Sequence, residues 1–284
     1  MLSYEVELEF ARELAWEAHA VLMEIYEEAG SDEGLLRIEQ KAAGAGPVTL
    51  ADQALNDLIV SRIRAAFPQD GILAEESADD GGRLEAGRFW CIDPLDGTKE
   101  FIKRNGEFSI MIGLVDRRAD SRPVLGVVVE PVQGQIMSAA LGQGAFVEAR
   151  GGVRRRLQVS SRDEGSSLRF IVSRSHPDPE ITEAGRRLSV ESVTPCGSVG
   201  IKLGRIAQDR ADVYLNFGGK TSFWDTCAPE AIFSEAGGRL TTLDGALIDY
   251  MAKSAHIRAP LVATNGACHA LVLQTCQAIA AGRS

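Results

Sequence analysis

The sequence has 284 residues, of which 45% are hydrophobic and 25% charged, and its formal net charge is −10. This length and composition are typical of a globular protein with one large domain or two packed subdomains. The acidic excess argues against a nucleic-acid polymer or an anionic membrane as partner. It still allows a small anionic ligand, because a few cations or a metal can reverse the potential inside one cleft.

Five cysteines, an odd number without a C-x-x-C pair, predict neither a disulfide framework nor a zinc site and indicate a reducing compartment. The first segment is acidic and amphipathic, unlike a signal peptide. No apolar run approaches the roughly 20 residues of a membrane span. We therefore expect a cytoplasmic protein.

Two helices are predicted at the start of the chain. Apolar residues recur at three- and four-residue intervals from Leu8 to Ile25, which predicts a helix with one buried face that ends near Gly30. A second helix is predicted to open at Thr49, where Asp52 would complete a capping box.

From residue 71 onward the pattern changes to short apolar strands separated by turn residues, which predicts an antiparallel meander. The strand-like stretches are GILAEES, RFWCIDP, FSIMIGLVD, PVLGVVVEP, GQIMSAAL and GAFVEA. The basic stretch RGGVRRRLQVSSRD follows and is a candidate connection between two halves, with Arg154–Arg156 as a solvated turn. We place the boundary between residues 1–155 and residues 156–284.

The second half mixes helices with strands. Helices are predicted near 178–189, across 198–209, after Trp224 and at the end of the chain, and ADVYLNF is a strand between them. A meander followed by this mixture favours a layered α+β architecture over a strict βαβ alternation.

Carboxylates gather beside structure breaks at five places along the chain. Three of them end apolar strands or follow a tryptophan, so we expect these to project from the rim of a sheet. The set is Asp52, Glu75 with Glu76, Asp93, Asp96 and Asp225. Hard oxygen ligands without a His or Cys cluster favour Mg²⁺ or Mn²⁺ over zinc. Taken singly, Asp52 and Asp225 could equally be helix caps, and Glu75 with Glu76 a solvated strand end.

The stretch DPLDGT holds Asp93 and Asp96 three residues apart. Like charges at this spacing repel, so they need a turn that separates them or a cation that joins them. Asp, Pro and Gly are common turn residues, and the stretch alone fits a plain turn equally well. Gly97 and Thr98 favour a phosphate-binding site over a plain turn, because they are predicted to open a helix whose free amides and dipole suit a phosphate.

The motifs GPVTLAD, LAEES, DPLDGT and WDTCAPEA occur in this order between about residues 40 and 265. In this respect the sequence resembles the lithium-sensitive, magnesium-dependent phosphatase superfamily. Inositol monophosphatases, 3'(2'),5'-bisphosphate nucleotidases and fructose-1,6-bisphosphatases belong to it. The resemblance implies a layered αβαβα sandwich of two subdomains, with most metal ligands in the first subdomain.

The resemblance also implies a metal site and a water-activating pair. The metal ligands would be Glu75, Asp93, Asp96, Asp225 and the carbonyl of Leu95. They would hold two or three Mg²⁺ ions, two of them bridged by Asp93, with Mn²⁺ as a substitute and Li⁺ as an inhibitor. Asp52 and Thr98 would position or deprotonate the attacking water, with Glu75 close by and Glu76 farther out.

For the substrate, DGTKEFIKRNGEFS and VSRSHPDPE resemble the CysQ-type nucleotidases of bacteria, which remove the 3'-phosphate from adenosine 3',5'-bisphosphate. This implies a small phosphorylated substrate and a Mg²⁺-dependent phosphomonoesterase that forms AMP. The implied substrate contacts are Gly97, Thr98, Gly197, Ser198, Lys202 and Asn216. Lys202 would face the second phosphate, although a helix-surface lysine is an equal alternative.

Asn216 departs from the CysQ-type pattern, which usually has an arginine at this place. Asparagine brings no charge, so Lys220 or Arg174 would have to compensate. His176 could stack on a base or cap the following turn. An inositol monophosphatase or a broad sugar phosphatase therefore remains an alternative. A non-catalytic metal- or nucleotide-binding protein is a third, disfavoured because all the acids and Thr98 are present. A homodimer is compatible with the resemblance.

Overall fold

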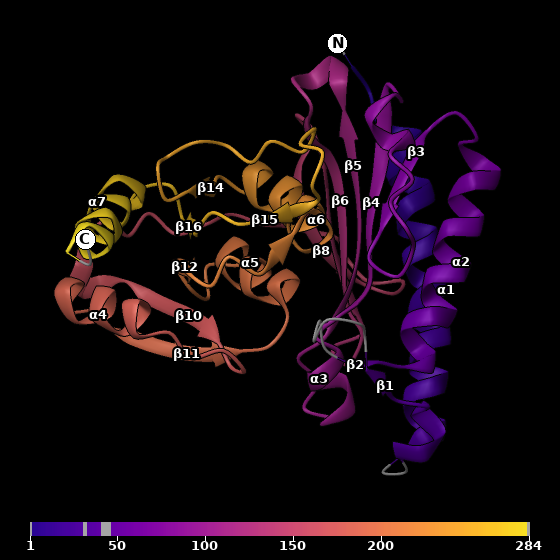
Figure 1. The fold of residues 1–284 in the computed structure, drawn as a ribbon, viewed down its shortest axis with the longest axis horizontal. Helices are drawn as coiled ribbons and strands as arrows, with labels where there is room; N and C mark the ends of the chain where they lie inside the picture. The colour runs from indigo at the N-terminus through magenta and orange to yellow at the C-terminus, as the bar shows by residue number, and fades with distance from the viewer. Residues whose placement is uncertain (1, 31–32, 41–46, 283–284) are drawn as a thin grey trace.

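The computed structural model describes residues 2–30, 33–40 and 47–282, which form five alternating layers of helices and sheets (Figure 1). This is the αβαβα sandwich that the resemblance implies. The motif GPVTLAD begins at Gly46 and the last predicted helix runs to residue 284, so those two ends lie outside the described residues.

The helices α1 (Glu5–Ala29) and α2 (Leu50–Ala66) form the outer layer on one side of the molecule (Figure 1). The predicted apolar stripe of α1 is buried except for Ile25, which is partly exposed. Thr49 caps α2, and Asp52 completes the predicted capping box. Both helices pack on one face of the larger sheet.

The larger sheet has seven strands in the order β3-β4-β5-β6-β7-β8-β9. Its first pair, β3 and β4, is parallel, and every later pair is antiparallel, so the predicted meander is confirmed. The strands are β3 (Gly71–Ala74), β4 (Arg88–Asp96), β5 (Ser109–Asp116), β6 (Arg122–Glu130), β7 (Gln135–Ala140), β8 (Gly144–Ala149) and β9 (Arg155–Arg156). The basic run predicted as a turn instead supplies the edge strand β9, because Arg155 and Arg156 pair with β8.

The middle layer consists of α5 (Val199–Ala207) and α6 (Phe223–Glu235), which lie between the two sheets (Figure 1). Two strand glycines let α6 approach the larger sheet. A Cβ on Gly126 would lie 2.1 Å from the carbonyl oxygen of Ala228, and one on Gly113 would lie 2.8 Å from the Ala228 amide nitrogen. Any side chain at these positions would push α6 away, together with the acid in its first turn.

The smaller sheet has five strands in the order β11-β10-β12-β16-β14 and carries the helices α4 (Pro179–Leu188) and α7 (His269–Ala281) on its outer face. Its strands are β10 (Arg169–Ser173), β11 (Ser192–Cys196), β12 (Val213–Asn216), β14 (Arg239–Thr242) and β16 (Leu261–Thr264). Two short pairs complete the fold: β1 (Glu39–Gln40) with β2 (Pro47–Val48), and β13 (Thr221–Ser222) with β15 (His256–Ile257).

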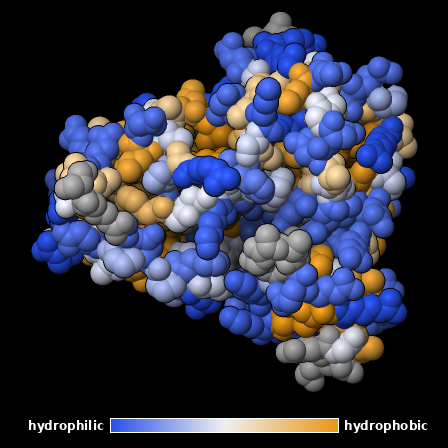
Figure 2. Space-filling model, viewed as in Figure 1, coloured by the Kyte–Doolittle hydropathy of each residue, from blue (hydrophilic) through white to orange (hydrophobic). Residues whose placement is uncertain are grey.

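Buried apolar side chains form three clusters. One lies between the larger sheet and the helices α1 and α2, and one between the smaller sheet and the helices α4 and α7. The third surrounds the middle helices and contacts both sheets. Hydrophilic side chains predominate on the face shown in Figure 2, where hydrophobic ones occur in small groups. Among the residues that the structure describes, no helix has the length and apolar character needed to cross a membrane. The boundary between residues 155 and 156 stays a prediction.

Candidate active site

A β-bulge in β4 brings Asp93 and Asp96 to the same face of the larger sheet. Asp93 pairs with Met111 of β5, whereas Asp96 pairs with Ser109, so three steps along β4 match two steps along β5. In a regular strand, residues three apart point to opposite faces. The extra residue of the bulge restores both acids to the face toward α6. The first four residues of DPLDGT therefore form a bulge within the continuous strand β4 and not the plain turn that the stretch alone would also fit.

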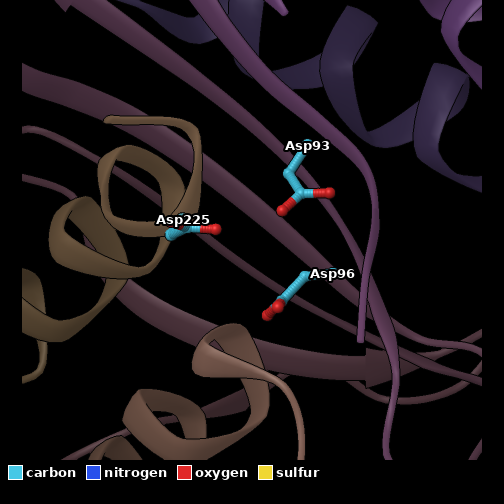
Figure 3. A group of neighbouring side chains, drawn as sticks. All are labelled: Asp93, Asp96 and Asp225. Carbon is cyan, nitrogen blue, oxygen red and sulfur yellow. The ribbon is translucent and has the colours of Figure 1, made fainter. Parts of the chain in front are cut away.

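The first turn of α6 supplies a third carboxylate, Asp225. Its Oδ2 accepts a hydrogen bond of 2.5 Å from the amide of Ser222, in a capping box that closes the helix start. Ligand oxygens of Asp93, Asp96 and Asp225 all lie within 4.8 Å of one another, and Figure 3 shows the three side chains pointing toward one space. Asp225 thus caps its helix and joins the cluster, where the sequence had offered these roles as alternatives.

The three acids hold protons more tightly than ordinary carboxylates. Burial is the largest cause of the raised pKa of Asp93, followed by the negative charges of Glu75, Asp96 and Asp225. Burial and the charges of Asp96 and Glu75 likewise raise the pKa of Asp225. Glu75, which follows β3, therefore lies within electrostatic reach of both acids, but it is not part of the three-acid group, and its role as a ligand stays a prediction.

This oxygen cluster fits a divalent cation. Buried carboxylates that repel one another cost free energy unless they are protonated or neutralised by a counter-charge. Carboxylate and carbonyl oxygens are the donors that Mg²⁺ and Mn²⁺ prefer, and the nearby Leu95 carbonyl belongs to the same bulge. The donor chemistry and the unfavourable charge together point to a cation site at this edge of the larger sheet.

Asp52 and Thr98 form a hydrogen-bonded pair beside the cluster. Asp52 Oδ2 accepts bonds of 2.7 and 2.6 Å from the amide and hydroxyl of Thr49, while its Oδ1 faces the Thr98 hydroxyl at 3.0 Å. Thr98 Oγ1 also lies 3.3 Å from the Leu95 carbonyl oxygen, a second acceptor. Burial raises the pKa of Asp52, the bonds from Thr49 oppose this, and the charge of Glu76 adds to it. Asp52 thus both caps α2 and reaches the candidate site.

Thr98 opens the short helix α3 (Thr98–Ile102), and Gly97 is its N-cap with φ 97°. This left-handed conformation favours glycine, since a Cβ there would also lie 3.0 Å from the carbonyl oxygen of Glu107. The predicted helix start at Gly97 and Thr98 is confirmed.

Ser198 and Gly200, at the start of α5, donate hydrogen bonds to Asp96. The Ser198 hydroxyl donates to Asp96 Oδ2 at 2.5 Å, and the amide of Gly200 donates to the same oxygen at 3.0 Å. The hydroxyl of Ser109 lies 2.8 Å from that of Ser198. Gly197 packs closely here, because a Cβ on it would lie 2.5 Å from the Glu107 carbonyl oxygen. Ser198 is thus a partner of a predicted metal ligand in this structure.

Lys202 is buried in α5, with 2% of the residue exposed, which excludes the helix-surface alternative. Its ammonium donates to the carbonyl oxygen of Gly197 and lies 5.2 Å from the centroid of the Tyr214 ring. Burial lowers the pKa of Lys202, and the charge of Asp96 opposes this shift. The ammonium group of Lys202 therefore lies within electrostatic reach of Asp96 and Asp225.

Asn216 and Arg174 are both engaged by protein partners. The Asn216 amide donates to the Thr221 hydroxyl at 2.6 Å, and its oxygen accepts from the Gly218 amide at 2.9 Å. Arg174 forms a two-pronged ion pair with Glu107, at 2.6 and 2.5 Å. The contact of Asn216 with substrate therefore stays a prediction, and Arg174 is a poor replacement for the missing arginine.

Basic side chains gather near His176, which lies on the loop after β10. Partial burial lowers the pKa of His176, and the positive charges of Lys99 and Lys220 add to that effect. The His176 ring nitrogen Nδ1 lies 3.4 Å from the hydroxyl of Ser173, the last residue of β10, so capping of the following turn stays a prediction. Lys220 is exposed and lies within electrostatic reach of His176, and its compensation for Asn216 stays a prediction.

Two residues near the candidate site were not predicted from the sequence. Ser109 and Tyr214 lie in apolar strands, and no motif marks either of them. Burial raises the pKa of Tyr214, followed by the charges of Asp225 and Asp96, so this ring lies close to the acids. A polar residue inside an apolar strand was the available signal for Ser109.

Known proteins resemble this chain over most of its length. Residues 3–280 match the inositol monophosphatase family. A 3'(2'),5'-bisphosphate nucleotidase CysQ from Salmonella typhimurium is 38% identical over 244 residues, covering 86% of this chain and 93% of the relative. A 3'-phosphoadenosine 5'-phosphate phosphatase from Mycobacterium leprae is 34% identical over 259 residues, covering 87% and 86%.

Solved structures show the same fold. CysQ from Bacteroides thetaiotaomicron is 30% identical with a TM-score of 0.77, covering 93% of this chain and 99% of that chain. An IMPase from Thermotoga maritima has a TM-score of 0.80 at 24% identity, covering 98% and 99%. These matches confirm the resemblance drawn from the four motifs. The chain therefore belongs to the inositol monophosphatase family.

Proposed function

We propose that this chain is a Mg²⁺-dependent phosphomonoesterase that converts adenosine 3',5'-bisphosphate and water into AMP and phosphate. The observation that carries the proposal is the convergence of Asp93, Asp96 and Asp225 beside the Asp52–Thr98 pair. Relatives 34 to 40% identical to this chain are named as phosphatases of this substrate class. The repelling acids supply the metal site, and the hydrogen-bonded pair supplies the water site.

Two or three Mg²⁺ ions would be held by the carboxylates and one backbone oxygen. The proposed ligands are Glu75, Asp93, Asp96, Asp225 and the Leu95 carbonyl. When bound, the ions would lower the pKa of water and neutralise the charge that develops on the phosphoryl group and its leaving oxygen. The resemblance also supports Mn²⁺ as a substitute and Li⁺ as an inhibitor.

Asp52, Thr98 and Glu75 would manage the proton of the attacking water. Because Thr98 donates its own hydrogen to Asp52 at 3.0 Å, its oxygen lone pairs are free to accept a hydrogen bond from water. The raised pKa of Asp52 makes it a better proton acceptor than an ordinary carboxylate. As the water oxygen bonds to phosphorus, the bond to the 3'-oxygen breaks, and that oxygen takes up a proton.

The phosphate groups would bind at two places. The amides of Gly97 and Thr98 at the start of α3 would hold the 3'-phosphate, since these amides point away from the helix. Ser198 donates to Asp96 and Lys202 donates to Gly197, and we place the remainder of the nucleotide beside Gly197, Ser198 and Lys202. A cation there suits the 5'-phosphate.

A substrate panel tests this function. Phosphate release would be measured from adenosine 3',5'-bisphosphate, inositol 1-phosphate and fructose 1,6-bisphosphate, with Mg²⁺, with EDTA and with added Li⁺. We expect the highest kcat/KM for the adenosine bisphosphate, with loss of activity in EDTA and inhibition by Li⁺. A preference for inositol 1-phosphate would contradict the substrate, and no release from any compound would contradict the enzyme.

The Lys202→Met variant tests the second phosphate site. Removing the buried charge is expected to raise KM for adenosine 3',5'-bisphosphate about tenfold, because a charge-assisted hydrogen bond contributes about 1.5 kcal/mol. Adenosine 3'-phosphate, which lacks the 5'-phosphate, is the matched control and should lose much less. Equal losses on both nucleotides would show that Lys202 acts on the carboxylates instead.

A further inference from the structure

Arg83 is a fully buried cation that the proposed chemistry does not use. It lies in the short 3-10 turn Gly82–Leu84, between β3 and β4, and its side chain is 0% exposed. A Cβ on Gly71, the first residue of β3, would lie 2.7 Å from the Arg83 Cα, so the turn packs directly on that strand. A buried arginine normally repays its desolvation by holding several partners.

The guanidinium joins segments that are far apart in the sequence. Its Nε donates to Asp79 Oδ2 at 2.9 Å. The other nitrogens donate to the carbonyl oxygens of Tyr250, Ala252 and Lys253 at 3.3, 3.0 and 3.1 Å. The planar fork thereby fastens the loop at residues 250–253 to the segment that follows the strand β3.

The Arg83 guanidinium also lies within cation–π distance of two aromatic rings. Its guanidinium carbon lies 5.8 Å from the centroid of Phe89 in β4 and 5.6 Å from that of Phe223 in α6. Cation–π contacts at this distance are favourable when they are removed from water. One side chain therefore touches the strand that carries Asp93 and the helix that carries Asp225.

Each of these contacts lies a few residues from a carboxylate of the candidate site. Asp79 follows Glu75 by four residues, Phe89 precedes Asp93 by four, and Phe223 precedes Asp225 by two. The chain that follows this loop lies beside the start of α6, because β15 (His256–Ile257) pairs with β13, which directly precedes that helix. There, the amide of Phe223 donates to the Ala255 carbonyl oxygen at 2.9 Å.

We propose that Arg83 is a positioning residue that fixes the spacing between the carboxylates of the first half and Asp225 of the second. The inference rests on the metal site of the proposed function. Four mutually repelling acids come from three separate segments, and a brace is needed to hold them at cation-binding distance before the cation arrives. Arg83 contacts all three segments and no carboxylate of the cluster, so it acts through the backbone that it holds.

Two variants test this role through binding of the metal alone. Arg83→Lys keeps the charge but loses the fork, and Arg83→Met removes both. We expect Mn²⁺ affinity, measured by calorimetry without substrate, to fall about tenfold in Arg83→Lys and further in Arg83→Met. The Mg²⁺ concentration for half-maximal activity should rise in parallel, while kcat at saturating Mg²⁺ stays within about threefold of wild type.

Arg88→Met is the matched control. Arg88 also pairs with acids, Asp70 at 2.8 Å and Glu7, and its guanidinium carbon lies 5.5 Å from the centroid of the Phe67 ring. These partners lie in α1 and in the turn between α2 and β3. Its loss should lower the melting temperature and leave Mn²⁺ affinity unchanged.

Several outcomes would overturn the inference. Unchanged Mn²⁺ affinity in folded Arg83→Lys, or an equal loss in Arg88→Met, would show a merely structural role. If Arg83→Met does not fold, the Arg83→Lys result decides. Absence of Mn²⁺ binding by the wild-type chain would overturn the metal site and this inference together. Normal Mn²⁺ binding without phosphate release would overturn the proposed function alone.

Discussion

The environment of buried Asp212 lowers its pKa, whereas the environment of the buried pair Asp93 and Asp225 raises theirs. Asp212, at the start of β12, is 0% exposed and accepts hydrogen bonds of 2.8 Å from Arg169 Nε and 2.5 Å from the Ser160 hydroxyl. Burial alone would raise the pKa of Asp212, but the bonds from Arg169 and Ser160 outweigh it and lower the pKa. At Asp93 and Asp225, burial and neighbouring acids both raise the pKa.

This difference separates a structural acid from the proposed metal ligands. The charge of Asp212 is neutralised within the protein, so the folded state gains from its ionisation. The charges of Asp93 and Asp225 are opposed by the protein, so the folded state gains from a proton or a cation at that place. Burial is common to both groups, and the partners decide which role each has.

The largest expected effect is on catalysis in Asp93→Asn. Removing a proposed bridging ligand should lower kcat/KM by about a thousandfold or more, because both the water and the phosphoryl group lose their cation. The free energy of unfolding in EDTA should be unchanged or higher, since one repelling charge disappears. Phosphate release and urea denaturation in EDTA measure the two effects. Activity near that of wild type would refute the assignment of Asp93.

Asp212→Asn should give the opposite pattern. We expect the free energy of unfolding to fall by about 2 kcal/mol, because fully buried Asp212 loses its charge-assisted bonds, while partly buried Arg169 keeps Asp209 as a charged partner. The kcat/KM of the folded fraction should stay within about twofold of wild type. Urea denaturation and active-site-normalised kinetics check this. A stable but inactive variant would place Asp212 with the functional acids and erase the contrast.

The smallest expected effect is in the pH dependence of stability. In EDTA, the raised pKa values of Asp93 and Asp225 mean that the folded state holds protons after the unfolded chain has released them. Their contribution therefore becomes unfavourable as pH rises from about 4 through the folded-state pKa values. The lowered pKa of Asp212 has the opposite sign: its stabilisation is present above about pH 4 and is lost below it.

Mg²⁺ competes with those protons at the carboxylates. The rise in melting temperature caused by saturating Mg²⁺ should therefore be about 5 °C at pH 8 and smaller near pH 5. Thermal denaturation at both pH values, with Mg²⁺ or EDTA, measures it. A Mg²⁺ effect independent of pH would mean that the cation binds elsewhere, and Asp212→Asn should leave the Mg²⁺ effect intact.

Local features of the fold and site were predictable from the sequence. The capping box of Thr49 and Asp52, the helix start at Gly97 and the meander each depend on residues within a few positions of one another. Short-range rules describe such features well. The acids drew attention because the sequence places each beside a predicted strand end or helix start, although Asp93 in fact lies inside β4 at its bulge.

The rest depends on tertiary contacts that no local pattern encodes. Arg83 and Tyr250 are 167 positions apart in the chain, and Ser198 and Asp96 are 102 apart. Lys202 has the periodicity of a helix residue, and its burial follows from the position of α5 between two sheets. The sequence could not decide between a cap and a place in the candidate site for Asp52 and Asp225, because each caps a helix and also reaches that site.

The bulge in β4 has a consequence for experiments that scan the site. A two-residue spacing would also place two acids on one face, so the inserted residue is not needed to align them. The insertion turns the Leu95 carbonyl toward the Thr98 hydroxyl, 3.3 Å away, while the Leu95 side chain packs in the cluster beneath α1 and α2. A backbone oxygen survives every side-chain replacement. An alanine scan would therefore test the carboxylates and miss the Leu95 carbonyl, the proposed backbone ligand. Deleting one residue within Pro94–Leu95 would test it, because the deletion removes the bulge that presents this oxygen.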